Sequence, residues 1–200
     1  MKGYNKPIIA ILFILVLDQT LKTWIKTNMY LGQEFNVLGN WFIIHFTENN
    51  GMAFGMEFGG ELGKLALSIF RIIAVGGIGY GLIHLIKNKY NRGLIMNVAF
   101  IFAGALGNII DSVLYGVIYG YEKVFHGRVV DMLYFPLIQG NFPLWVPVWG
   151  GEEFIFFRPV FNLADASISI GVIFILLYQK RYFKEEEVVE KSLNSEIVEE

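Results

Sequence analysis

The 200-residue chain contains no cysteine, and it has only three histidines and five prolines. Without cysteine, disulfide bonds, thiolate metal sites and a cysteine nucleophile are excluded. His45, His84 and His126 stand at unrelated spacings, so the sequence predicts no metal site. Positive charge is also sparse. The sixteen Lys and Arg residues are scattered around apolar segments, and this pattern predicts no nucleic-acid partner.

What the chain does have is apolar sequence. Hydrophobic residues make up 54% of it, which is too much for an ordinary soluble domain. Four apolar segments reach about the twenty residues that a helix needs to cross a bilayer. The first follows Lys2 and Lys6 as in a signal peptide, but no small-residue cleavage site follows it, so we expect a retained span. The chain is therefore predicted to be an α-helical integral membrane protein with four transmembrane helices, at about residues 7–26, 65–86, 94–117 and 161–180.

The distribution of Lys and Arg predicts the orientation of these helices. Basic residues precede the first span, fill the turn between the second and third, and follow the fourth. The positive-inside rule then places both termini in the cytoplasm. Residues 27–64 and 118–160 would lie outside, and the aromatic and β-branched content of 40–46 predicts a small extracytoplasmic β-containing cap. The aromatic stretch 142–149 is suited to the lipid headgroup zone.

Two aspartates, Asp131 and Asp165, stand at the water-facing ends of apolar stretches. A carboxylate near a bilayer core is costly unless it is paired, wetted or buried in protein, so each one is a candidate functional residue. Two carboxyl groups at close range cannot easily both ionise and can share a proton, as in aspartyl proteases. The alternative for Asp165 is an ordinary carboxylate in the first turn of a helix, with Asn162 as the helix cap.

Further polar residues occur at helical spacing inside the apolar segments. Asp18 and Lys22 are four residues apart and share one helix face. They are either a buried pair that points inward or a Lys that snorkels to the surface beside a compensating Asp. Asn108 and Asp111 are three apart, after small residues that permit close helix packing, and a polar clamp between helices is the simplest interpretation.

The segment Thr47–Gly55 contains Asn49 and Gly51. Taken alone, its Asn-Asn-Gly sequence indicates a turn. Its small residues would also let the backbone approach a ligand closely.

These motifs occur together in a recognisable order. Over about residues 8–177 the chain resembles bacterial lipoprotein signal peptidases, also called signal peptidase II. The resemblance implies an intramembrane aspartyl endopeptidase of the bacterial inner membrane, with its active site near the outer face and no metal or cofactor. It would remove the signal peptide from diacylglyceryl-modified prolipoproteins, cutting before the lipidated cysteine. The implied catalytic pair is Asp131 and Asp165, and the implied supporting or substrate-binding residues are Asp18, Lys22, Asn49, Gly51, Asn108, Asp111, Asn162 and Ala164.

The chain departs from the family pattern in two places. The family usually has Arg directly after the aspartate at position 111, where this chain has Ser112, and Arg128 is the candidate for the missing guanidinium. The stretch 132–160 is also longer than in many relatives, as is 115–127.

Residues 1–184 are predicted to form one membrane-embedded peptidase domain, with 185–200 as an acidic, disordered cytoplasmic tail. A small transporter or proton relay that uses the same intramembrane charges is the alternative function, and a lipid-binding scaffold without catalysis is another. The expected partners are the prolipoprotein substrate and membrane lipid.

Overall fold

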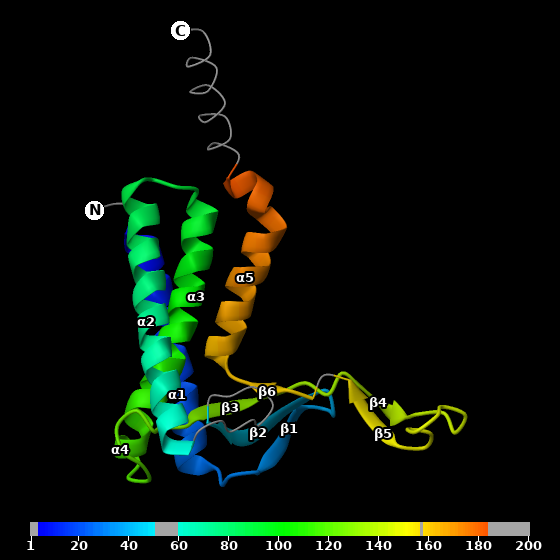
Figure 1. Cartoon of the computed structure of the whole chain (residues 1–200). Coiled ribbons are helices and arrows are strands. Elements are labelled where there is room, and N and C mark those ends of the chain that lie inside the picture. The colour runs from blue at the N-terminus through cyan, green and yellow to red at the C-terminus, as the bar shows by residue number, and fades with distance from the viewer. Residues whose placement is uncertain (1–3, 51–59, 157, 184–200) are drawn as a thin grey trace.

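The computed structural model describes residues 4–50, 60–156 and 158–183. Four long helices form a bundle: α1 (Asn5–Asn28), α2 (Gly60–Lys87), α3 (Arg92–Ile110) and α5 (Leu163–Tyr182) (Figure 1). After Ile110, α3 continues through the π-helical turn η2 (Asp111–Tyr115) into the short helix α4 (Gly116–Ile118). All four helical segments are long and apolar enough to cross a membrane, which confirms the four spans expected from the sequence.

The helices expose their large apolar side chains outward and pack through small residues inside. Phe13 and Val16 of α1 are about two-thirds exposed, at 67% and 66%, as expected for side chains that face lipid. At the α3–α5 contact, a Cβ atom on Gly104 would lie 2.2 Å from the carbonyl oxygen of Ala164. The two backbones therefore approach more closely than any larger residue would permit.

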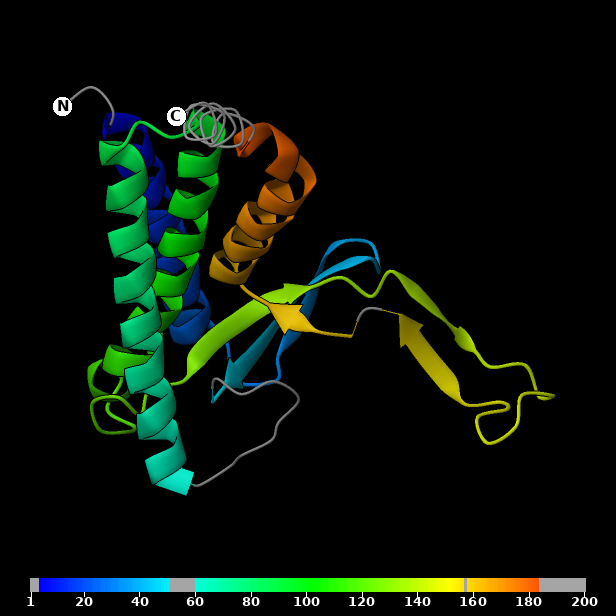
Figure 2. The ribbon, with the colours of Figure 1, turned by 45° about the horizontal axis from the view of Figure 1, so that its top comes forward.

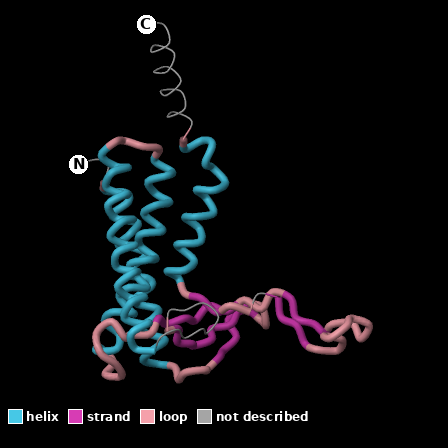
Figure 3. Tube along the Cα trace, viewed as in Figure 1, coloured by secondary structure: helices cyan, strands magenta, loops and turns pink. Residues whose placement is uncertain are grey.

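The strands gather at one end of the bundle (Figure 3). Four antiparallel strands form a sheet in the order β1 (Glu34–Leu38), β2 (Phe42–Asn49), β3 (Val129–Tyr134) and β6 (Val160–Phe161). This sheet confirms the β-containing cap. A separate hairpin of β4 (Ile138–Asn141) and β5 (Glu153–Phe156) projects away from the bundle (Figure 2).

A hydrophobic core joins the sheet to the bundle. Its buried members come from α1 and the residue that follows it, and from β2, η2 and β3: Ile25, Met29, Phe46, Tyr115, Val130 and Met132. Because β3 is buried on both faces from Val129 to Met132, it is fixed between the helices and its neighbouring strands.

The opposite end of the bundle collects the start of α1, the α2–α3 turn and the end of α5 (Figure 1). Among the described residues, the basic ones used to predict the orientation therefore share one end, and the sheet occupies the other: Lys6, Lys87, Lys89, Arg92, Lys180 and Arg181. Two parts of the sequence interpretation, Gly51 and the tail at 185–200, lie outside the described residues.

Candidate active site

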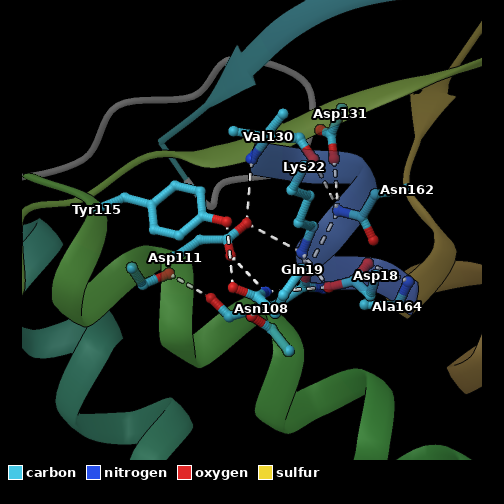
Figure 4. A network of polar contacts seen from close by, with 12 residues as sticks. Asp18, Gln19, Lys22, Asn108, Asp111, Tyr115, Val130, Asp131, Asn162 and Ala164 are labelled. Carbon is cyan, nitrogen blue, oxygen red and sulfur yellow. Dashed lines mark hydrogen bonds and ion pairs between the residues drawn. The ribbon is translucent and has the colours of Figure 1, made fainter. Parts of the chain in front are cut away.

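The pairing of β3 with β6 brings Asp131 to the start of α5. Leu133 of β3 lies opposite Phe161 of β6, and Asn162 follows Phe161 directly. The Asn162 side chain donates a hydrogen bond from Nδ2 to Asp131 Oδ1 at 2.7 Å (Figure 4). Both residues are buried, with 0% exposure for Asn162 and 4% for Asp131.

The same asparagine caps α5. Asn162 Oδ1 accepts a hydrogen bond from the backbone N–H of Asp165 at 2.9 Å, and Asp165 Oδ2 accepts one from the Asn162 N–H at 3.3 Å. This reciprocal pair is a capping box. The local interpretation of Asn162 and Asp165 as a helix start is therefore correct. It coexists with the approach of both residues to Asp131, so the two interpretations are not alternatives.

A buried charge cluster lies next to these residues and is hydrogen-bonded to Asn108 and Ala164. Lys22 Nζ lies 2.9 Å from Asp18 Oδ2 and 2.9 Å from Asp111 Oδ2, and none of the three side chains is more than 1% exposed. Lys22 also donates to Asn108 Oδ1 at 3.0 Å. The buried, inward-pointing pair is confirmed, and the snorkelling interpretation of Lys22 is wrong.

This cluster orients the amide of Asn108. Lys22 has only donors, so the Asn108 side chain turns its oxygen toward Nζ. Its Nδ2 then donates to Asp165 Oδ1 at 2.7 Å. In the same way, Asn162 Oδ1 is occupied by the Asp165 N–H, which leaves Nδ2 to face Asp131. Each of the two carboxylates thus receives one amide N–H with a fixed orientation.

Asp18 and Ala164 connect α1 to α5. Asp18 Oδ1 accepts from the Ala164 N–H at 3.0 Å, one of the first-turn donors that have no partner within a helix. A Cβ atom on Gly107 would lie 2.9 Å from Asp18 Oδ2, so glycine leaves room for this contact. The motif residue Ala164 is completely buried at this junction.

Two members of the network were missed by the sequence analysis. Gln19 Nε2 donates to Asp111 Oδ1 at 3.0 Å, and Tyr115 OH donates to Gln19 Oε1 at 3.1 Å. The sequence could have indicated Gln19, because it is a polar residue beside Asp18 in an apolar helix. Tyr115 could not have been found in this way, because its position depends on the π-helical turn that begins at Asp111 and widens the helix.

Burial and charge together shift the ionisation of Asp131. Burial, followed by the nearby charge of Asp165, raises its pKa to about 7. Hydrogen bonds from Asn162 and Asn49 and the charge of Lys22 oppose this rise. Asn49 is thereby placed at the site. Among the residues described, no group of three or more His, Asp or Glu side chains is arranged to hold a metal ion.

The geometry joins two carboxyl groups, fixed amide donors and a buried charge cluster at one end of a four-helix membrane bundle. The family model for signal peptidase (SPase) II matches residues 10–181. The chain belongs to the signal peptidase II family. It is 51% identical to a lipoprotein signal peptidase of Porphyromonas gingivalis, across 86% of this chain and 81% of the relative. It is 41% identical to one from Amoebophilus asiaticus, across 88% and 76%.

Solved structures of a bacterial membrane enzyme share this fold. One, determined at 1.9 Å resolution, has a TM-score of 0.61 and 29% identity, over 87% of this chain and 92% of the other. A second, at 2.3 Å, has a TM-score of 0.59 and 30% identity, over 88% of both chains. The chain is thus an α-helical membrane protein of a family of signal peptidases, with four spans and a β-containing cap.

The guanidinium that the family usually carries after Asp111 has two candidates in the structure. Arg128 Nη1 lies 3.2 Å from Glu48 Oε2, and its guanidinium stacks over the Tyr121 ring at 5.5 Å. Arg71 of α2 instead donates from Nη1 to Ser112 Oγ at 3.2 Å and interacts electrostatically with both Asp131 and Asp165. This arrangement favours Arg71 over Arg128. Its signal in the sequence was that it is the one Lys or Arg between Leu65 and Ile86.

Proposed function

We propose that the chain is an intramembrane aspartyl endopeptidase that removes the signal peptide from diacylglyceryl-modified prolipoproteins, cutting before the lipidated cysteine. The observation that carries the proposal is the approach of Asp131 and Asp165 at Asn162, which bonds both residues. Membership of the signal peptidase II family supports it, as does the name of the Porphyromonas gingivalis relative.

The chemistry needs one proton shared by the two carboxyl groups. Burial and the charge of Asp165 raise the pKa of Asp131 to about 7, so near neutral pH a substantial share of the enzyme carries one proton on this carboxyl pair. The ionised member accepts a proton from a water molecule, which attacks the scissile carbonyl carbon. The protonated member donates a hydrogen bond to the carbonyl oxygen and stabilises the charge that develops there. The proton gained from water then passes to the peptide nitrogen as the C–N bond breaks, and the carbonyl re-forms as the new carboxyl group of the released signal peptide.

The remaining network keeps this pair in place. Asn108 and Asn162 hold one oxygen of each catalytic carboxylate, and Lys22 with Asp18 and Asp111 fixes the amide of Asn108. A water nucleophile and two carboxyl groups complete the reaction without a metal or organic cofactor.

We also propose that the active site lies near the outer face of the bacterial inner membrane, with both termini in the cytoplasm. The basic residues Lys87, Lys89 and Arg92 of the α2–α3 turn lie at the bundle end opposite the sheet, which the positive-inside rule assigns to the cytoplasm (Figure 1). Near the outer surface, water reaches the aspartates while the acyl chains of the substrate stay in the bilayer.

Residues 1–184 would form the peptidase domain, and 185–200 a dispensable cytoplasmic tail. The test uses purified full-length protein with one prolipoprotein substrate, prepared with and without the diacylglyceryl group and followed by the size shift of cleavage. Each buried methylene of the acyl chains contributes about 0.8 kcal/mol to retention. We expect cleavage of the lipidated form and little or none of the unlipidated form, for the full chain and for a chain ending at Lys184. Equal cleavage of both forms would contradict the proposed specificity.

A further inference from the structure

Arg71 lies inside the second membrane span, on α2. An arginine at membrane depth is costly unless it faces the protein interior and meets a partner there. Arg71 meets this condition, because Nη1 donates to Ser112 Oγ at 3.2 Å on the neighbouring helix. Ser112 Oγ in turn donates to the carbonyl oxygen of Asn108 at 2.9 Å, and the Asn108 side chain bonds Asp165.

Several charges surround the two aspartates, and most are already neutralised in pairs. Lys22 reaches the site from α1, but it is held by two carboxylates of its own. Glu48 on β2 pairs with two cations, Lys26 of α1 and Arg128, which directly precedes β3. Arg71 interacts with both members of the catalytic pair from α2. The charged groups in question are Asp18, Lys22, Lys26, Glu48, Arg71, Asp111, Arg128, Asp131 and Asp165.

We propose that Arg71 is a positioning residue whose guanidinium holds the Asp131–Asp165 pair in its singly ionised form, taking from α2 the place that the family usually fills from position 112. A neighbouring positive charge favours the ionised form of a carboxyl pair. Removing that charge therefore makes the first ionisation harder and moves the acidic limb of the pH–rate profile to higher pH. This inference rests on the proposed peptidase function.

The test compares kcat/KM against pH for wild type, Arg71→Gln, Arg71→Ala and Arg71→Ala/Ser112→Arg on the lipidated substrate. Gln keeps a donor for Ser112 without the charge. We expect Arg71→Gln to lose about tenfold or more below pH 6 and less at pH 8, since one pKa unit corresponds to a tenfold change. The double variant should recover activity relative to Arg71→Ala, because the guanidinium returns from α3.

Thermal unfolding in detergent identifies the folded variants in this comparison. A pH profile for folded Arg71→Gln that matches wild type would overturn the inference, as would a folded double variant no more active than Arg71→Ala. Either result with an active wild type leaves the proposed function intact. An inactive wild type would count against the proposed function itself.

The β4–β5 hairpin and its connecting loop at 142–152 form a separate feature of the molecule, away from Arg71. Figures 1 and 2 both show this hairpin projecting sideways from the sheet end of the bundle. An isolated two-stranded hairpin is marginally stable in water. This one has its own aromatic contacts, with the Phe142 ring 5.0 Å from Phe154 and 6.3 Å from Trp149.

The outer surface of the hairpin loop is strongly apolar. Leu144, Trp145 and Val148 are 89%, 82% and 87% exposed, although each would ordinarily be buried. Residues 137–156 include no Lys or Arg, and their two acidic residues are Glu152 and Glu153. Attraction to anionic headgroups therefore cannot hold the hairpin at a membrane.

We infer that this loop inserts its apolar side chains into the boundary between headgroups and acyl chains of the bilayer that surrounds the bundle. The hairpin connects β3 to β6, and Asn162 and the first turn of α5 follow β6 directly. The hairpin therefore leaves the sheet close to the end of the membrane-crossing helix α5 that lies at the sheet. Aromatic residues are favoured at this depth because a ring buries its apolar body beside polar headgroups. This contact would enlarge the area over which the enzyme touches the bilayer surface near the Asp131–Asp165 site.

The absence of native cysteine gives a direct test. Spin labels on Leu144→Cys, Val148→Cys and Lys123→Cys are compared in phosphatidylcholine nanodiscs for collisions with oxygen and with a water-soluble nickel chelate. Lys123 is exposed on a different loop at the same end of the bundle. We expect the labels at 144 and 148 to favour oxygen several-fold over the label at 123, with no loss in 0.5 M salt. Chelate accessibility equal to that at 123 would overturn the inference, and so would loss of the oxygen preference in 0.5 M salt.

Discussion

Asn162 donates a 2.7 Å hydrogen bond to Asp131 while its side-chain oxygen caps the helix that carries Asp165. One residue thus bonds both of the carboxylate-bearing residues proposed to be catalytic. The side-chain oxygen of Asn162 forms a local contact that starts α5, and its side-chain nitrogen forms a long-range contact with Asp131. The two contributions can be separated because they use different atoms of the same amide.

Replacing Asn162 by Ser tests this division. The serine hydroxyl can still accept from the Asp165 N–H, but it has no amide to reach Asp131. A hydrogen bond to a charged group is worth about 1.5–3 kcal/mol, so we expect kcat to fall about 10- to 100-fold. Stability should fall less than in Asn162→Ala, because the cap remains. Asn162→Ala, which also loses the cap, is the comparison for thermal unfolding, and an Asn162→Ser enzyme with wild-type kcat would exclude the positioning role.

The buried charge cluster predicts an asymmetric effect on stability. Lys22→Met leaves Asp18 and Asp111 buried without their cation, so we expect a loss of about 3–5 kcal/mol. Converting both aspartates to Asn in the same chain should return much of that stability, because the uncompensated charges are removed. Unfolding in detergent measures each step, with exposed Lys87→Met as the neutral control. A single variant no less stable than this control would refute the account of the cluster.

The raised pKa of Asp131 predicts a pH-dependent stability difference. In the unfolded chain this carboxyl ionises near its ordinary pKa, whereas in the folded protein it ionises only near pH 7. Its contribution to stability is therefore present at low pH and is lost as pH rises toward and through 7. Asp131→Asn removes this penalty, so its Tm relative to wild type should increase between pH 5 and pH 8. A constant difference over that range would contradict the raised pKa.

The proposed orientation is tested by single cysteines in the cysteine-free chain. Asn91→Cys lies in the basic α2–α3 turn, and Glu152→Cys lies in the hairpin loop at the sheet end. In intact spheroplasts a membrane-impermeant thiol reagent should label the residue at 152 and leave the one at 91 unmodified until the membrane is lysed. Labelling at 91 before lysis would reverse the orientation derived from the Lys and Arg distribution.

The sequence was most informative where structure depends on local periodicity. Hydropathy located the four spans, and helical spacing placed Asp18 with Lys22 and Asn108 with Asp111 on shared faces. The motif order then pointed to Asp131 and Asp165 as partners. These features depend on neighbours three or four residues away or on a pattern shared with a family.

What the sequence did not reveal depends on contacts between distant segments. The π-helical turn after Ile110 directs Tyr115 toward Gln19, and no pattern in the sequence predicts that turn. Arg71 reaches Ser112 only because α2 packs beside the π-helical turn that continues α3. Arg128, the guanidinium suggested from the sequence, stands three residues before Asp131, but its side chain pairs with Glu48 instead.

The central claim is that Asp131 and Asp165 form one catalytic unit. Its most direct test is single-turnover cleavage of the lipidated prolipoprotein by wild type, Asp131→Asn, Asp165→Asn and the double variant, each confirmed as folded in detergent. General acid–base groups typically contribute about 10²–10⁴-fold, so each single change should cost at least that much, and the double change little more than either. Near-wild-type cleavage by either folded single variant would contradict the account.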